Sequence, residues 1–276
     1  MRAALIQLTA SDDPGANLPV TRQLIAEAAA AGADIAMTPE VTNCVSNSRT
    51  RQDEVLRHET DDPTLASLRD ETARLGIWLL IGSLALKTGD PDGRFVNRSF
   101  LVGPDGGIAA RYDKIHMFDV EIDAGETYRE SAGYRPGDRA VLADTLLGRI
   151  GLTICYDLRF PALYRRLAHA GAQILTVPAA FSPVTGAAHW ETLLRARAIE
   201  TGCYVFAPAQ CGSHAASRGK QRRTHGHSLA VSPWGAILAD GGNMPGVTMV
   251  DFDPAEVEAA RGRVPSLTHD REFEGP

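Results

Sequence analysis

Residues 149–161 read Arg149-Ile150-Gly151-Leu152-Thr153-Ile154-Cys155-Tyr156-Asp157-Leu158-Arg159-Phe160-Pro161. The apolar run 149–154 predicts a buried strand, and the pattern after the proline predicts a helix over Ala162–Ala170. A strand followed closely by a helix is the repeating unit of α/β proteins. A turn of this kind points a side chain out of the sheet and leaves nearby backbone N–H groups free to bind an oxyanion. Cys155 is therefore well placed to react.

Apolar runs alternate with helical patterns along most of the chain, which predicts an α/β fold. Strands are predicted over Ala3–Leu8, Ile35–Thr38, Ile77–Leu84, Ser99–Val102, Ile108–Tyr112, Arg149–Ile154, Ile174–Val177, Tyr204–Ala207, Ser228–Val231 and Val247–Phe252. Helices are predicted over Leu18–Ala31, Thr64–Leu75, Ala162–Ala170 and His189–Thr201. The segment 103–107, Gly-Pro-Asp-Gly-Gly, predicts a hairpin turn. Hairpins beside βα units favour mixed rather than purely parallel sheets.

Composition narrows the function classes. The chain has 276 residues, 44% of them hydrophobic, and can form a large core without a metal or a disulfide. Its net charge of −6 gives no basic face for nucleic acid or an anionic membrane. The first apolar run is too short for a secretory signal, and none approaches the roughly 18 residues of a membrane span. Four sparse cysteines without CxxC spacing favour reduced thiols, so a cytoplasmic protein is expected.

Three chemically active side chains follow three predicted strands. Glu40 follows 35–38, Lys114 follows 108–112, and Cys155 follows 149–154. Each has an ordinary alternative, because most free cysteines are small buried hydrophobes and most glutamates and lysines are surface charges. Sites assemble where the carboxyl ends of strands meet in α/β sheets, however, so a carboxylate, an ammonium and a thiol are expected to converge there.

Other chemistries lack a supporting pattern. The sequence has no phosphate-binding loop, no dinucleotide fingerprint and no HExxH motif. His225 and His227 would supply two metal ligands, but no third ligand has a recognisable spacing, so no metal site is expected. Ser228 lies in a GxSxG-like string, yet the helix that a serine nucleophile needs does not follow it. The basic segment Gly212–Thr224 is the best candidate for a mobile loop.

Several blocks of sequence carry a resemblance to a known family. They are Pro39-Glu40, then 112–119 (Tyr-Asp-Lys-Ile-His-Met-Phe-Asp), 155–161, 185–190 with 194–200, and 225–228 with 233–235. In these blocks, which span nearly the whole chain, the sequence resembles the nitrilase superfamily of carbon–nitrogen hydrolases. It looks most like the branch containing deaminated glutathione amidase and omega-amidase.

The resemblance implies one domain over residues 1–276, folded as a four-layer α-β-β-α sandwich of two mixed sheets. It also implies a triad of Glu40, Lys114 and Cys155, with Glu130 matching a second family glutamate that orients Lys114 or the substrate amide. No cofactor is implied. A homodimer or a larger even homo-oligomer is expected.

A thioester mechanism suits this set of residues. The thiolate of Cys155, favoured by the nearby ammonium, would attack the carbonyl, and Glu40 would transfer protons in both half-reactions. Lys114 and the backbone N–H of Tyr156 would hold the oxyanion. The expected reaction is hydrolysis of the amide C–N bond of a small carboxylated amide, resembling deaminated glutathione or an omega-amide keto acid.

Substrate recognition rests on fewer signals. Arg159 is expected to bind the substrate carboxylate through two parallel hydrogen bonds, and Phe181 to form an apolar wall beside it. Ala162 stands where this branch commonly has a glutamate, so Arg159 is expected to be less fully paired. Alternative readings are a nitrile or N-carbamoyl hydrolase using the same triad, and a catalytically idle scaffold or binding protein on the same fold.

Overall fold

Strands and helices alternate along the chain, as the sequence pattern predicts. The structure, a computed structural model, describes residues 1–123 and 126–275. Its helices are α1 Pro14–Ala30, α2 Arg49–Val55, α3 Pro63–Leu75, α4 Pro161–His169, α5 Pro183–Thr201 and α6 Ala255–Arg263, with 3-10 helices η1 Glu59–Asp61, η2 Glu130–Ala132, η3 Cys155–Arg159 and η4 Ser266–Thr268. Its strands are β1 Arg2–Gln7, β2 Ile35–Met37, β3 Trp78–Lys87, β4 Phe95–Val102, β5 Ile108–Asp113, β6 Asp119–Asp123, β7 Glu126–Arg129, β8 Val141–Thr145, β9 Gly148–Leu152, β10 Ile174–Thr176, β11 Tyr204–Ala207, β12 Cys211–Ser213, β13 Arg223–His225, β14 Leu229–Val231, β15 Ile237–Asp240 and β16 Gly246–Asp251.

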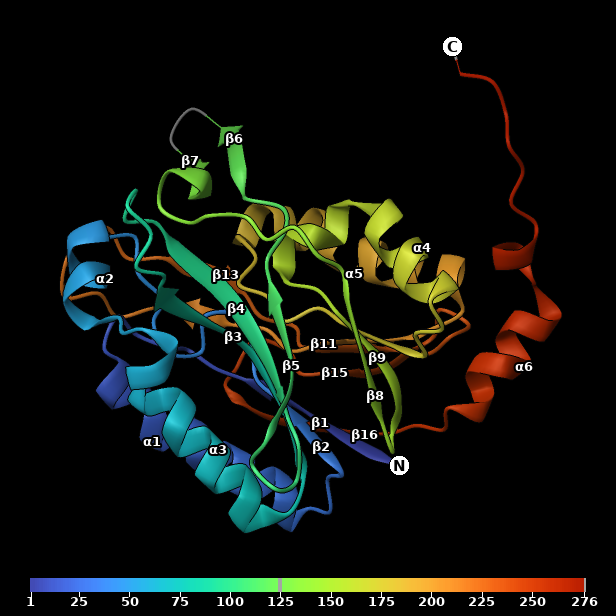
Figure 1. The fold of residues 1–276 in the computed structure, drawn as a ribbon, viewed down its shortest axis with the longest axis horizontal. Coiled ribbons are helices and arrows are strands. Elements are labelled where there is room, and N and C mark those ends of the chain that lie inside the picture. Colours follow the sequence, from blue (N-terminus) through green and yellow to red (C-terminus); the bar gives the residue numbers. More distant parts are fainter. Residues whose placement is uncertain (124–125, 276) are drawn as a thin grey trace.

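Two six-stranded sheets form the centre of the molecule (Figure 1). The first has the order β16-β1-β2-β3-β4-β5 and the second the order β15-β14-β11-β10-β9-β8. In each, three neighbouring strands run parallel, β1-β2-β3 and β9-β10-β11, while the outer pairs are antiparallel. The expectation of mixed sheets is confirmed.

Four layers follow from the alternation of side chains along the strands. On β1, Ala3 and Leu5 belong to the core that both sheets share, whereas Ala4 and Ile6 belong to the core beneath α1 and α3. Helices α4 and α5 cover the other face of the second sheet, so the layers run helix, sheet, sheet, helix (Figure 1). The four-layer α-β-β-α arrangement is therefore confirmed.

The predicted strands and helices all overlap observed ones, with shifted ends. Helix α5 begins at Pro183 rather than His189, because Ser182 caps its first turn by accepting from the N–H of Thr185. Helix α1 begins at Pro14 rather than Leu18 for the same reason, since Asp13 caps Gly15 and Ala16. Sequence patterns missed the short or exposed elements α2, α6, β6, β7, β8, β12, β13 and β15.

The connections place the candidate residues at one end of both sheets. Glu40 follows β2 and Lys114 follows β5 in the first sheet, while Cys155 follows β9 in the second. Glu130 opens η2 directly after the β6–β7 hairpin. Residues from two facing sheets are thereby brought to a shared site.

Candidate active site

Cys155 occupies a strained turn between β9 and α4. Its φ of +50° lies in the left-handed region that non-glycine residues rarely adopt. The buried carboxylate of Asp157 fixes the turn, because it accepts from the Ile154 N–H at 2.8 Å and from the Tyr112 hydroxyl at 2.6 Å. The Cys155 N–H donates to the carbonyl of Pro178 at 2.9 Å. Strain held in place by its surroundings is a feature of functional sites, and here it fixes the direction of the thiol.

Glu40 is 3% exposed, and its carboxylate is fully hydrogen-bonded. Oε1 accepts from Lys114 Nζ at 2.9 Å and from Asn97 Nδ2 at 2.9 Å, while Oε2 accepts from the Ala180 N–H at 2.9 Å. The Cys155 side chain lies close enough to this carboxylate for each group to act on the pKa of the other. The carboxylate is thus in contact with both the thiol and the ammonium.

Lys114 is held between two carboxylates. Its Nζ lies 2.9 Å from Glu40 Oε1 and 2.8 Å from each carboxylate oxygen of Glu130. Glu130 is fixed in turn, since its Oε2 accepts from the Phe118 N–H at 2.6 Å. Of the two groups that Glu130 was expected to orient, Lys114 is the one it contacts in the structure.

The pKa values of Cys155, Glu40 and Lys114 are shifted by burial and by the charges of neighbouring groups. Burial raises the pKa of the Cys155 thiol well above its ordinary value, and the Glu40 carboxylate raises it further against the opposing effect of Lys114. Burial also acts to raise the pKa of Glu40, but Lys114 and Arg222 hold that pKa below its ordinary value. Burial acts to lower the pKa of Lys114, yet Glu130 and Glu40 raise it well above its ordinary value. These directions favour a neutral thiol beside an ionised base at rest, the starting point expected if Glu40 takes the thiol proton.

Glu40, Lys114, Glu130 and Cys155 all line one cavity of about 890 Å³. Tyr156, whose N–H was expected to bind an oxyanion, lines it too and is the second residue of η3. Backbone N–H groups in the first turn of a helix have no partner within the helix, so this N–H remains available for the expected role. Phe181 also lines the cavity and packs against Trp190 in a tilted arrangement, with ring centroids 4.7 Å apart.

Arg159 lies outside the lining of this cavity within the described residues. Its Nη1 lies 3.2 Å from His189 Nδ1, and its guanidinium lies 5.8 Å from the Tyr156 ring centroid and 5.6 Å from that of Phe181. In the part of the chain that the structure describes, the contacts of Arg159 are with this histidine and the two rings, and no acid pairs with it. The predicted carboxylate contact would require the side chain to leave its present position beside His189 and reach the cavity.

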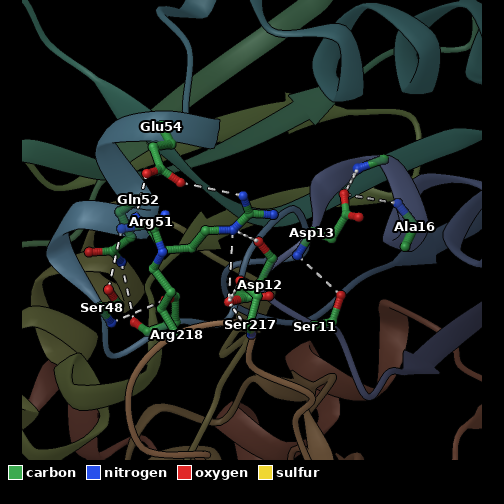
Figure 2. A network of polar contacts seen from close by, with 12 residues as sticks. Ser11, Asp12, Asp13, Ala16, Ser48, Arg51, Gln52, Glu54, Ser217 and Arg218 are labelled. Atoms are coloured by element: carbon green, nitrogen blue, oxygen red, sulfur yellow. Dashed lines mark hydrogen bonds and ion pairs between the residues drawn. The ribbon is translucent and has the colours of Figure 1, made fainter.

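The segment Gly212–Thr224, expected to be a mobile loop, is anchored at several points. Its ends pair as β12 and β13. In its middle, the Ser217 N–H and hydroxyl each donate to Asp12 Oδ2 at 2.7 Å, and Arg218 pairs with Glu54 (Figure 2). Arg51 reaches both acids, with its Nε 3.8 Å from Asp12 and its Nη1 3.6 Å from Glu54. This anchored loop forms part of the cavity wall.

Sequence reasoning missed three groups that complete the site. Asn97 and the Ala180 N–H bind Glu40, and Arg222 donates from Nη2 to the Ala180 carbonyl at 2.7 Å. A polar residue inside the apolar run 95–102 was the available signal for Asn97. Nothing in the sequence distinguishes Arg222 from the other basic residues of its segment.

The histidine and serine alternatives have structural explanations. The rings of His225 and His227 stack with centroids 4.7 Å apart, and His227 Nδ1 lies 3.0 Å from Asp240. No group of three or more metal-ligating side chains occurs among the described residues. Ser228 Oγ donates to Gln7 Oε1 at 2.8 Å and accepts from the Ala209 N–H at 2.9 Å, so it acts as a buried structural link. In the described part of the chain, no helix is long and apolar enough to cross a bilayer.

Comparisons with known proteins agree with this geometry. Residues 2–262 match the family model described as carbon-nitrogen hydrolase. The chain is 40% identical to a deaminated glutathione amidase of Yersinia enterocolitica over 269 residues, which is 97% of this chain and 92% of that protein.

Two solved structures extend the likeness. One is Saccharomyces cerevisiae Nit3, a member of branch 10 of the nitrilase superfamily, with a TM-score of 0.86, 29% identity and coverage of 99% of this chain and 97% of Nit3. The other is an amidase mutant from Nesterenkonia sp. AN1 carrying the acetamide moiety of fluoroacetamide on its active-site cysteine, with a TM-score of 0.79, 26% identity and coverage of 98% and 94%. The chain described here therefore belongs to the carbon–nitrogen hydrolase family.

Proposed function

We propose that the protein is an amidase that hydrolyses the C–N bond of a small carboxylated amide through a thioester on Cys155. The observation that carries the proposal is the contact between the Glu40 carboxylate, the Lys114 ammonium and the Cys155 side chain at one cavity. The relatives named deaminated glutathione amidase support a substrate of the deaminated-glutathione or omega-amide keto-acid class.

The first half-reaction follows from the ionisation states. Because Cys155 rests as a thiol and Glu40 as a carboxylate, Glu40 takes the thiol proton as the sulfur attacks the amide carbonyl. The oxyanion that forms is stabilised by the Lys114 ammonium and the Tyr156 N–H. Glu40 then delivers its proton to the departing nitrogen, which leaves an acyl thioester on Cys155 and releases ammonia or an amine.

The second half-reaction repeats these roles with water. Glu40 takes a proton from a water molecule that attacks the thioester, and the sulfur leaves as a thiol when the proton returns to it. Glu130 does not touch the substrate in this scheme. It is a positioning residue that keeps Lys114 directed at the site of the oxyanion.

A release assay tests the proposal. Purified protein is offered omega-amide keto acids, glutamine-like amides, nitriles and N-carbamoyl compounds, and the release of ammonia is measured. We expect turnover of carboxylated amides and none for the Cys155→Ser variant. Preferential turnover of nitriles or carbamoyl compounds would favour the alternative reactions, and no turnover of any compound would favour an idle scaffold.

We propose that no cofactor takes part, because each proton transfer and charge is assigned to a side chain or backbone group. Dialysis against EDTA is expected to leave the rate unchanged. Loss of activity that zinc restores would contradict this and return His225 and His227 to consideration as ligands.

We also propose a single domain over 1–276, a cytoplasmic location and a homodimer or larger even homo-oligomer. The shared core of the two sheets supports the first, and the four free cysteines support a reducing compartment. Exposed Val184 and Ile199 on α5 supply apolar surface for pairing. Analytical ultracentrifugation tests the oligomer, and a monomer at micromolar concentration would contradict it.

A further inference from the structure

Arg222 forms part of the cavity wall and is only partly satisfied by the protein. Its Nη2 donates to the Ala180 carbonyl at 2.7 Å. Its Nε is buried and has no hydrogen-bond partner within the described residues. A buried guanidinium nitrogen without an acceptor is costly, and an acceptor on a ligand would relieve that cost.

The cavity carries an excess of positive charge. Its acidic side chains, Glu40 and Glu130, both bind Lys114. Its other cationic side chains, within the described residues, are Arg49, Arg129, Lys220, Arg222 and Arg223. Arg49 already donates to the carbonyls of Gly133 and Gly93. The cavity lining therefore has more cations than acids, and this net positive charge suits an anionic group.

Arg222 lies close to the reacting groups. The Ala180 residue that it binds through the carbonyl donates its N–H to Glu40 Oε2 at 2.9 Å. A single residue, Ala180, thus links the guanidinium to the proposed catalytic base. A group bound at Arg222 would lie only a few bonds from the scissile amide.

The loop that carries Arg222 is held in place before any ligand binds. Ser217 is bound to Asp12, which precedes α1, and Arg218 is bound to Glu54 of α2 (Figure 2). Fixing a charged group in its binding position lowers the entropy lost on binding. Arg159, by contrast, is not among the described residues that line the cavity, and its guanidinium lies near the rings of Tyr156 and Phe181.

We propose that Arg222 is the residue that binds a carboxylate of the substrate and so determines the preference for acidic amides. The inference rests on the proposed amidase function and assigns the carboxylate contact to the anchored loop instead of to Arg159. The carboxylate belongs either to the acyl part of the amide or to the departing amine. The fork of the guanidinium suits either source.

Two matched substrate pairs at neutral pH test the proposal. Glutaramate against glutaramide changes a carboxylate on the acyl side into a carboxamide, with ammonia release as the readout. N-Butanoylglycine against N-butanoylglycinamide does the same on the amine side, with butyrate release as the readout. Wild type is compared with Arg222→Gln, Arg222→Lys, Arg159→Gln and, as a control away from the cavity, Arg195→Gln.

The expected result is selective. In Arg222→Gln, kcat/KM for the charged member of one pair falls about 10- to 100-fold more than kcat/KM for the neutral member, and this selective loss appears in KM, as is typical of a lost hydrogen bond to a charged group. Arg222→Lys loses less, because it keeps the charge without the fork. The affected pair identifies the side that carries the carboxylate.

Three outcomes would overturn the proposal. An equal fall in kcat for charged and neutral members would make Arg222 a positioning residue for Glu40. A preference that survives Arg222→Gln but disappears in Arg159→Gln would return the carboxylate to Arg159. The absence of any preference for charged members in wild type would remove carboxylate recognition altogether.

A binding measurement separates this inference from the amidase proposal. In Cys155→Ser, calorimetric titration with glutaramate is expected to give a Kd about 10- to 100-fold lower than in Cys155→Ser/Arg222→Gln. If the substrate pairs place the carboxylate on the acyl side, equal Kd values for glutaramate would overturn the inference. If they place it on the amine side, the same titration is made with N-butanoylglycine, and equal Kd values there would overturn it. This result does not depend on whether wild type turns over any amide.

Discussion

Two buried cysteines, Cys155 and Cys203, share several properties and differ in what surrounds the sulfur. Both are free, both adjoin strands of the second sheet, and each lies near a cation. Lys114 acts on Cys155, whereas Arg261 Nη2 lies 3.1 Å from Cys203 Sγ. Burial raises the pKa of both thiols despite those cations.

The difference lies in the base and the cavity. Cys155 contacts the Glu40 carboxylate and lines the cavity of about 890 Å³. Cys203 donates to the carbonyl of Ala172 at 3.2 Å and lies among core residues. A nearby cation therefore does not make a nucleophile in this protein. A partner that can take the proton, and room for a substrate, distinguish the reactive thiol.

Replacing each cysteine by alanine, one at a time, is expected to give the largest effect. Cys155→Ala should reduce turnover to background while leaving the circular dichroism spectrum unchanged, because no other group can form the thioester. Cys203→Ala, Cys44→Ala and Cys211→Ala should leave kcat/KM within a few-fold. Full activity in Cys155→Ala would refute the thioester mechanism.

Glu40→Gln tests the base. The amide keeps the size of the side chain but cannot accept the thiol proton, so kcat should fall about 100- to 10,000-fold. Glu130→Gln is the matched control, because it also removes one carboxylate from Lys114 while leaving the base in place. Equal losses in the two variants would mean that charge balance around Lys114, and not proton transfer, limits the rate.

The pH dependence should separate the base from the thiol. Glu40 is active as the carboxylate, and its pKa lies below the ordinary value, so kcat/KM should fall only at a pH below the range in which an ordinary glutamate titrates. Because the pKa of Cys155 is raised, its alkylation by iodoacetamide should not accelerate between about pH 6 and 8 as an unperturbed thiol would. A steep rise in the Cys155 alkylation rate over that range would show a thiol that titrates freely.

The α/β fold class and the positions of the candidate residues beside the strands could be predicted from sequence because their signals are local, whereas the four-layer arrangement came from the family resemblance. Apolar runs mark β1, β3 and β9. Glu40, Lys114 and Cys155 each lie within three positions after the end of a strand, namely β2, β5 and β9. The raised pKa of Cys155 could not be predicted in this way, since it depends on burial and on Glu40, a residue far along the chain. The same limit applies to Arg222, whose role is set by its contact with Ala180 across 42 positions.

The anchoring of residues 212–224 was also beyond sequence patterns, and it leads to the smallest expected effect. Small polar and basic residues favour a solvated loop, but Asp12 accepts two hydrogen bonds from Ser217 and pairs with Arg51. These partners come from distant parts of the chain, so composition alone could not indicate them.

Asp12→Asn should loosen this wall of the Cys155 cavity without touching the reacting groups. An amide still occupies the position but loses the charge that attracts Arg51 and weakens the bonds from Ser217. We expect KM to rise about two- to tenfold with kcat nearly unchanged, as for loss of a partly buried charge-assisted hydrogen bond. Backbone amides of 214–222 should exchange hydrogen faster, and a bulky maleimide should reach Cys155 sooner, while Cys203 stays protected by its core neighbours. Equal acceleration at both cysteines would indicate global destabilisation, and no change at either would show that the loop holds its position without Asp12.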